Sequence, residues 1–341
     1  MRMDVMLRTA LLFTLASAAW GQVGGPVLGY LPDGNSIRTM YGLPAAGAVG
    51  AALNTVRALT LSAVSPSQNF ALGVAADTGE LLLVIPSADG STAAVSSVAG
   101  AAAGASAIVL SPEGSAAASW FSSTGHVQVV TGLPGSAAVL DIDASFLGAN
   151  PASLAVSDDG QWVAGAWTQG LYVFGATGQV TVLPADAPVT ALSFFHRRAD
   201  IALATATQAI TIADIGGSAT PTIVWSVPVD PSQPPASHTG HLPRRRHPGS
   251  PASSLVGIGV SFDNNSVVMA WDSGDLVTIN LAAGTSAGAD CGCVPIGIFG
   301  LGGSVFRLTG LNSGALKVFD SASGDAWFVP LAASSADGGQ Q

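Results

Sequence analysis

The sequence predicts an all-β fold, a ring of repeated sheets known as a β-propeller. The first observation is a repeated turn. The phrase SDDGQW at 157–162 recurs in altered form at 65–70, 111–115 and 261–265. The second observation is the spacing, because Ser65, Ser111 and Ser157 follow one another at intervals of 46 residues, close to the length of one four-stranded blade. The third is the short apolar strand that precedes each copy, with two further strands after it.

The blade around residue 157 is the template for the strands. Its period-two alternation predicts an innermost strand at 153–156, a second at 162–166, a third at 171–174 and an outer edge at 179–183. In the turn between the first two strands, Asp158 can cap backbone N–H groups and Gly160 accepts a positive φ. Because such carboxylates recur once per blade on the same rim, we interpret them as turn chemistry rather than as catalytic groups. The structural turn positions are Ser65, Ser111, Ser157, Asp158, Gly160 and Ser261.

Two degenerate copies complete the series. The segment 189–213 keeps the order strand, polar turn, strand, strand, with Phe195 aligned to the repeated serine. The segment 295–320 keeps the same order, with Phe299 in the aligned position. Six full blades are therefore expected at 57–99, 103–147, 152–186, 189–227, 255–286 and 294–331.

The segment at 27–44, ahead of these blades, matches the outer hairpin at 171–184. In both, an apolar strand ends in a Gly-containing turn and a second strand closes on Pro. The ring therefore has six full blades plus an N-terminal hairpin, and six or seven blades in total. The hairpin is either a two-stranded seventh blade or a cover over an exposed sheet edge, which would limit edge-to-edge association.

The N-terminal segment at 1–21 is typical of a secretory signal peptide. Arg2 and Arg8 precede an apolar run at 10–19, and small residues allow cleavage near Ala18 or Gly21. The run is too short for a spanning helix. We therefore expect a secreted or periplasmic protein with a propeller domain at 22–331 and a disordered tail at 332–341.

The segment at 230–254 differs sharply in composition from the rest of the chain. The whole sequence has a net charge of −10. It is rich in Pro and contains Arg244, Arg245 and Arg246 together with three of the five histidines. We interpret it as a flexible basic insertion between blades, able to contact an anionic surface or the protein's own acidic rim. Three arginines without aromatic platforms do not predict nucleic-acid binding.

The only two cysteines are Cys291 and Cys293, in a Cys-Gly-Cys sequence before the last blade. In an oxidising compartment they can form a tight disulfide. The alternatives are free or structural thiols, or metal or redox chemistry, although a closed zinc site needs four ligands and two more are not visible nearby.

No arrangement of residues typical of catalysis is present in the sequence. His126 and His196 lie in different blades, and no nucleophile elbow, phosphate loop or dinucleotide fingerprint occurs. We therefore assign no catalytic residue, no cofactor and no metal site. Trp167, Trp271 and Tyr172 could form a ligand platform, but aromatic residues in blades more often fill the core between sheets.

The repeated Ser-Asp-Asp-Gly phrase, the strand order around it and the signal peptide together resemble bacterial secreted β-propellers of the WD40-like and YVTN-repeat type. The chain departs from true WD40 blades in lacking the Gly-His dipeptide, and Trp271-Asp272 follows the second strand rather than closing the third. The resemblance implies a rigid ring that presents loops to another protein, a glycan or a small ligand.

From this resemblance we expect a non-enzymatic binding scaffold that uses its rim loops or channel mouth, a monomer with no membrane span. The alternative is a hydrolase or lyase, lactonase-like, with a site at the central channel. The two differ in one feature. An enzyme requires Asp, Glu, His or Arg side chains that converge on one channel mouth, whereas a scaffold has apolar or Ser/Thr channel walls.

Overall fold

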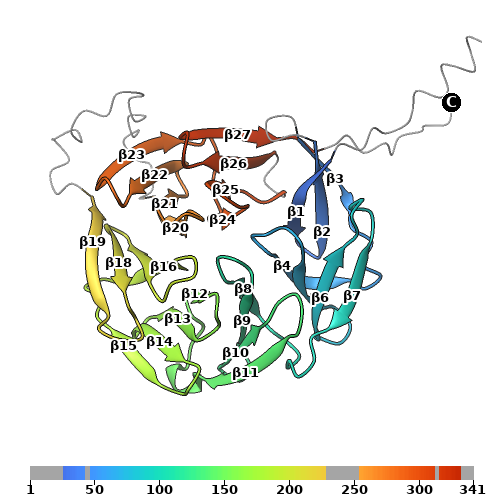
Figure 1. The fold of residues 1–341 in the computed structure, drawn as a ribbon, viewed down its shortest axis with the longest axis horizontal. Helices are drawn as coiled ribbons and strands as arrows, with labels where there is room; N and C mark the ends of the chain where they lie inside the picture. The colour runs from blue at the N-terminus through green and yellow to red at the C-terminus, as the bar shows by residue number, and fades with distance from the viewer. Residues whose placement is uncertain (1–25, 43–46, 228–252, 312–314, 332–341) are drawn as a thin grey trace, which may run out of the picture.

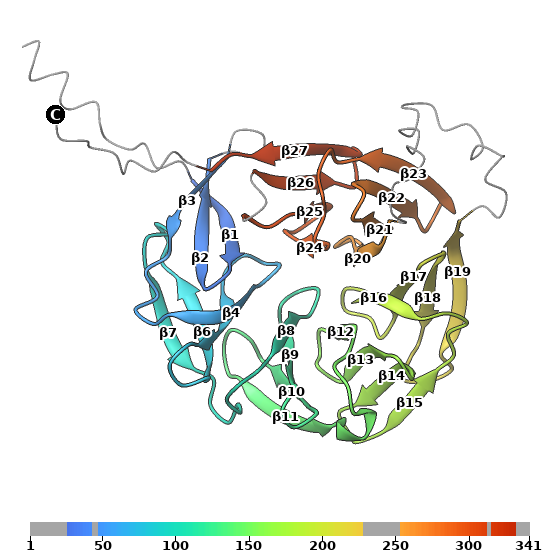
Figure 2. The same ribbon diagram turned by 180° about the vertical axis from the view of Figure 1, so that it is seen from behind.

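The computed structural model describes residues 26–42, 47–227, 253–311 and 315–331 of the 341-residue chain. The predicted signal peptide, nearly all of the basic insertion and the predicted tail lie outside the described residues. Seven sheets surround a central axis, and the chain passes once around the ring, so that the first and last sheets are neighbours (Figure 1). The view from behind shows the same closed ring (Figure 2). The fold is an all-β, seven-bladed propeller.

Each sheet is one blade, numbered in chain order. Blade 1 holds β1 (Val27–Asp33), β2 (Ser36–Tyr41) and β3 (Ala48–Ala52). Blade 2 holds β4 (Leu59–Val64), β5 (Ala71–Ala75), β6 (Leu81–Pro86) and β7 (Ala93–Ser97). Blade 3 holds β8 (Ala107–Leu110), β9 (Ala116–Phe121), β10 (His126–Thr131) and β11 (Ala138–Asp143). A short 3-10 helix, η2 (Ser145–Leu147), follows it.

Blade 4 holds β12 (Ser153–Val156), β13 (Trp162–Trp167), β14 (Gly170–Gly175) and β15 (Val180–Leu183). Blade 5 holds β16 (Val189–Phe194), β17 (Ile201–Thr205), β18 (Gln208–Ala213) and β19 (Thr220–Ser226). Blade 6 holds β20 (Leu255–Val260), β21 (Ser266–Trp271), β22 (Asp275–Asn280) and β23 (Thr285–Asp290). Blade 7 holds β24 (Phe299–Gly300), β25 (Val305–Arg307), β26 (Leu316–Asp320) and β27 (Asp325–Val329).

In blades 2 to 7 the first strand lines the channel and the fourth lies at the perimeter (Figure 1). This order places the turns between first and second strands on one side of the ring, which we call the turn face. The segments that connect one blade to the next lie on the opposite side, which we call the connection face. The turns between second and third strands also lie on the connection face.

The same backbone turn repeats in five blades, as the sequence predicts. The amide of Ser157 donates to the carbonyl of Trp162 at 2.9 Å, and Ser65, Ser111, Phe195 and Ser261 each make the equivalent bond five residues ahead. In blade 7 the alignment of Phe299 with these residues is wrong. Phe299 lies in β24, and the turn begins at Leu301, whose amide donates to the carbonyl of Val305. This turn is one residue shorter and rich in Gly, so the repeated phrase is absent.

The N-terminal hairpin is part of a three-stranded blade, and the predicted match to an outer hairpin is wrong in its strand positions. The short strand β3 adds to β2, so β1 and β2 occupy the second and third positions of a blade. β1 begins at the turn face, where the amide of Tyr30 donates to Gln68 Oε1 at 2.7 Å. β1 ends at the connection face, where Leu59 at the start of β4 donates to the carbonyl of Asn35. Among the residues that the structure describes, blade 1 therefore has no counterpart of the innermost strand of the other blades.

The ring closes between its first and last blades. The amide of Val49 in β3 donates to the carbonyl of Pro330 at 2.9 Å, and Val49 forms a parallel bridge with Leu331. A buried apolar cluster that includes Leu31, Met40 and Val318 fills the space between blades 1 and 7. Similar clusters separate the other neighbouring blades, which is the usual core of a repeat ring.

Candidate functional site: the central channel and its two mouths

The central channel encloses a cavity of about 750 Å³, which is within the usual size range of small-molecule sites. The innermost strands form most of its wall, and their channel-facing residues are mainly Ala, Val, Leu, Ile and Gly, with a few Ser and Thr. Besides Tyr30, the ionisable side chains on the wall are Asp33, Glu113, His196 and Arg307. The wall is thus mainly apolar, as expected of a binding scaffold. Asp33 forms an ion pair with Arg38, and Glu113 forms one with Arg197.

At the turn face, Asp158 connects three consecutive blades. Its Oδ1 accepts a hydrogen bond from the amide of Glu113 in blade 3 at 2.7 Å, and its Oδ2 accepts one from the amide of Arg197 in blade 5 at 2.8 Å. Its backbone carbonyl accepts a bond from Ser115 Oγ at 2.6 Å. The neighbouring Asp159 differs, because it accepts only from Ser157 Oγ and the amide of Gln161, inside its own turn. The contacts between blades therefore come from the first aspartate of the repeated phrase.

The other charged groups of this mouth are also paired. Glu113 Oε1 lies 2.5 Å from Arg197 Nε, which links blades 3 and 5 above Asp158. Asp263 accepts from Ser261 Oγ and from the amide of Asn265, and these hydrogen bonds lower the pKa of its carboxyl group. At this mouth Asp158 and Glu113 therefore join neighbouring turns, whereas Asp263 stabilises its own turn.

His196 is the exception at the turn face. Its side chain is only 8% exposed, and its Nδ1 has no hydrogen-bond partner among the described residues. Its ring lies 4.6 Å from the ring of Phe262, and its backbone exchanges two hydrogen bonds with the side chain of Asn264. Burial lowers the pKa of His196, an effect that the charges of Asp158 and Glu113 partly oppose. His196 is therefore neutral at pH 7 and packs as an aromatic ring between blades 5 and 6.

These groups do not assemble into the catalytic arrangements that the alternative hypothesis requires. No hydroxyl or thiol of the described residues forms a hydrogen bond with His196, so a nucleophile and base pair is not formed there. Within the described part of the chain, no group of three His, Cys, Asp or Glu side chains could hold a metal ion. Trp167 and Trp271, considered as a ligand platform, are buried between blades.

Arg307 in β25 was not predicted from the sequence. The residue is 6% exposed and lines the cavity, and its Cζ lies 4.0 Å from the centre of the Phe299 ring. One nitrogen donates to the carbonyl of Thr309 at 3.2 Å, and no carboxylate of the described residues pairs with it. Burial lowers the pKa of Arg307 to about 10, so that it remains charged at pH 7. The only sequence signal is a single Arg in an otherwise apolar strand.

The connection face bears a different feature, exposed apolar side chains on the segments between blades. Phe146 in η2 is 61% exposed, and Val294 before β24 is 64% exposed. Ile296 lies on the same connection as Val294, Val56 and Val227 lie on two others, and all three are also exposed. We call Val56, Phe146, Val227, Val294 and Ile296 the connection-face apolar residues.

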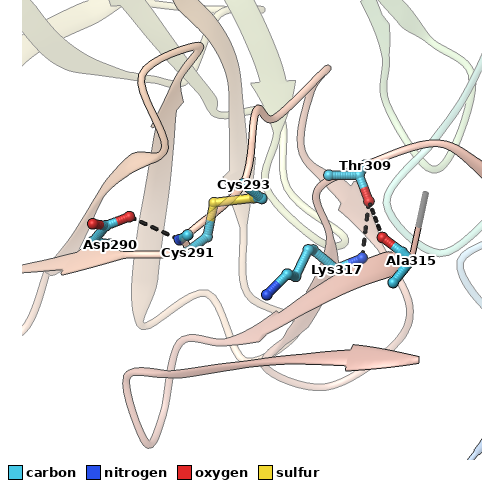
Figure 3. Close-up of a disulfide and its surroundings, with 7 residues drawn as sticks. Asp290, Cys291, Cys293, Thr309, Ala315 and Lys317 are labelled. Atoms are coloured by element: carbon cyan, nitrogen blue, oxygen red, sulfur yellow. Dashed lines mark hydrogen bonds between the residues drawn. A yellow bond between two sulfur atoms is a disulfide. The ribbon is translucent and has the colours of Figure 1, made fainter. Parts of the chain in front are cut away.

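Cys291 and Cys293 lie on the same face, between β23 and β24, and are joined by a disulfide with an S–S distance of 1.99 Å (Figure 3). The amide of Cys291 donates to the carbonyl of Gly274, and the amide of Gly292 donates to Asp290 Oδ1 at 2.7 Å. Cys291 itself is buried against the apolar cluster between blades 6 and 7. The bridge thus fixes the segment that leads to Val294 and Ile296.

We expect the two cysteines of the purified protein to resist alkylation until a reductant is added, and Cys291→Ser/Cys293→Ser to fold. The closed loop is very short, so opening it returns little entropy to the unfolded chain, and we expect a loss of only about 1 kcal/mol. Mass spectrometry after alkylation with and without reductant measures the first outcome, and urea unfolding measures the second. Two alkyl groups added without reductant, or a variant that does not fold, would contradict this prediction.

No protein-family model matches the sequence, and no curated protein matches it. Solved structures do match. Sqt1 of Saccharomyces cerevisiae superposes with a TM-score of 0.53 at 13% identity, over 91% of this chain and 89% of that one. The dihydro-heme d1 dehydrogenase NirN in complex with DHE gives 0.46 at 19% identity, over 78% of this chain and 54% of that one. The β-propeller domain of Cps50 (Swd1) of Myceliophteria thermophila gives 0.43 at 13% identity, over 64% and 66%.

At these identities the likeness concerns the fold. The helices that the structure describes include none long and apolar enough to cross a membrane. The superposition on Sqt1 covers most of both chains and concerns the overall fold. The chain thus has the fold of a seven-bladed β-propeller.

Proposed function

We propose that this protein is a secreted, non-catalytic propeller that binds a partner protein through its connection face. The observation that supports this most directly is the set of connection-face apolar residues. Loops on a rigid scaffold are the usual place for binding residues, and large apolar side chains exposed on one face are typical of protein interfaces. The disulfide gives the loop that carries Val294 and Ile296 a fixed position before binding, which lowers the entropy cost of association.

The ionisable groups of the channel also favour a scaffold over a hydrolase or lyase. At the turn face Asp158 accepts hydrogen bonds from neighbouring turns, Glu113 pairs with Arg197, and His196 is neutral and packed on Phe262. Secretion rests on the apolar segment and cleavage motif near the N-terminus of the sequence. A partner outside the cytoplasm follows from that proposal.

Site-specific photocrosslinking in cells that export the protein tests the binding face. A photoreactive phenylalanine replaces Phe146 or Val294 in two variants and Val182 in a third. Val182 is the matched control, because it is apolar and 59% exposed but lies on the outer strand β15. We expect the first two variants to form a crosslinked product with one added mass, and the Val182 variant to form none. Equal crosslinking from Val182, or no product from Phe146 and Val294, would refute the proposal.

A further inference from the structure

No innermost strand of blade 1 is present among the described residues, and the cavity wall reaches β1 there; we call this side of the channel the niche. In the other blades the cavity wall comes from the innermost strands and their turns, but here it also includes Tyr30 and Pro32 of β1 and Val305 and Arg307 of β25. Pro66 limits the niche at the turn face, because a Cβ added to Gly300 would lie 3.8 Å from its Cβ.

Arg307 points into this niche rather than toward blade 6. Val305, two residues earlier, and Val318, opposite Arg307 in β26, both pack against blade 1. Phe306, which lies between Val305 and Arg307 in β25, packs against blade 6. Because side chains alternate between the two faces of a strand, Arg307 lies on the side of blade 1.

The internal repeats show that the fold itself does not require an arginine here. Arg307 pairs with Phe299 in the second register position after the turn. The same position in blades 2 to 6 is fully buried and apolar, and is occupied by Leu72, Ala118, Ala164, Ala202 and Val268. In those blades the innermost strand of the next blade covers the side chain. Within the described part of the chain, that strand is missing only after blade 7, and only there is the residue charged.

The niche does not suit an added peptide strand. The amide of Tyr30, which faces the niche, already donates to Gln68 Oε1, and Pro32, two residues on, has no N–H group. A strand that paired with β1 would have to displace Gln68 and would find no donor at Pro32. A small molecule that needs no backbone pairing is the better fit.

From these observations we infer that the niche and channel bind a small apolar molecule with a single carboxylate group, which pairs with Arg307. Arg307 is the only Lys or Arg among the described residues of the cavity wall, and a buried guanidinium without a carboxylate partner is costly unless an anion completes it. The aliphatic wall and the Phe299 ring accommodate the apolar part of the ligand. This site lies next to the partner surface proposed for the connection face, with which it shares Ile296.

Calorimetric titration with octanoate and with the neutral analogue 1-octanol tests the inference. We expect octanoate to bind the full-length protein at one site, and octanol to bind at least tenfold more weakly. Arg307→Met should weaken octanoate binding at least tenfold and change octanol binding less than twofold. Lys317→Met is the matched control, because it removes one charge from the next strand, outside the cavity wall, and should leave both affinities unchanged.

A second measurement uses the unaltered protein, so that the test stands even if Arg307→Met does not fold. Phenylglyoxal modifies arginine side chains, and peptide mass spectrometry locates the adducts. We expect octanoate to protect Arg307 from modification and octanol not to protect it. The inference is wrong if octanoate does not bind, if it binds Arg307→Met as well as the unaltered protein, or if it leaves Arg307 equally reactive.

Discussion

Asp158→Ala is expected to lower the free energy of unfolding by about 3 kcal/mol, because charge-assisted hydrogen bonds to two neighbouring blades are lost together. The amides of Glu113 and Arg197 would lose their acceptors, at 2.7 and 2.8 Å. Both amides belong to turns of other blades, so the loss affects the packing of blades 3, 4 and 5 and not only the local turn. Urea unfolding followed by circular dichroism measures the change.

Asp159→Ala is the control for this prediction. Asp159 is exposed and accepts only within its own turn, so its removal should cost about 1 kcal/mol. The comparison separates the contact between blades from turn stability in general. If the two variants lose equal stability, the hydrogen bonds from the amides of Glu113 and Arg197 to Asp158 are no more favourable than hydrogen bonds from the same amides to water.

Local chemistry explains why the blades could be predicted from the sequence. The innermost strand at 153–156 and the turn after it were predicted at their observed positions, since period-two alternation and a Ser-Asp-Asp-Gly turn are encoded within a few residues. The predicted six or seven blades resolve to seven. The third strand of blade 1, β3, is a short Ala- and Gly-rich segment whose pattern is too weak to predict a strand.

The niche could not be predicted from the sequence. It depends on which blades meet at ring closure and on the innermost strand that blade 1 lacks among the described residues. Arg307 has no partner within its own sequence neighbourhood that signals a role. Its position becomes informative only when the register aligns it with Leu72 and Ala118 in other blades. The turn contacts of Asp158 are equally long-range, with partners 45 and 39 residues away.

Gly125→Ala is expected to lower the free energy of unfolding by about 3 kcal/mol, the sum of backbone strain and a steric clash. Gly125 lies between β9 and β10 with φ +73°, a left-handed conformation that disfavours side chains. A Cβ there would lie 2.6 Å from the Cα of Ser145, a backbone atom that cannot rotate away. The first residue of η2 must therefore move.

Gly178→Ala is the matched control, because Gly178 has φ +87° but no atom within 4 Å of the added Cβ. Gly178→Ala should lower the free energy of unfolding by about 1 kcal/mol, because only the backbone strain contributes. Thermal and urea unfolding of both variants give the difference. Because Ser145 directly precedes Phe146, Gly125→Ala should also reduce crosslinking from position 146, whereas Gly178→Ala should not. If both variants lose the same free energy of unfolding, the η2 segment moves without an energetic penalty. The connection face would then lack the rigidity on which the proposed binding depends.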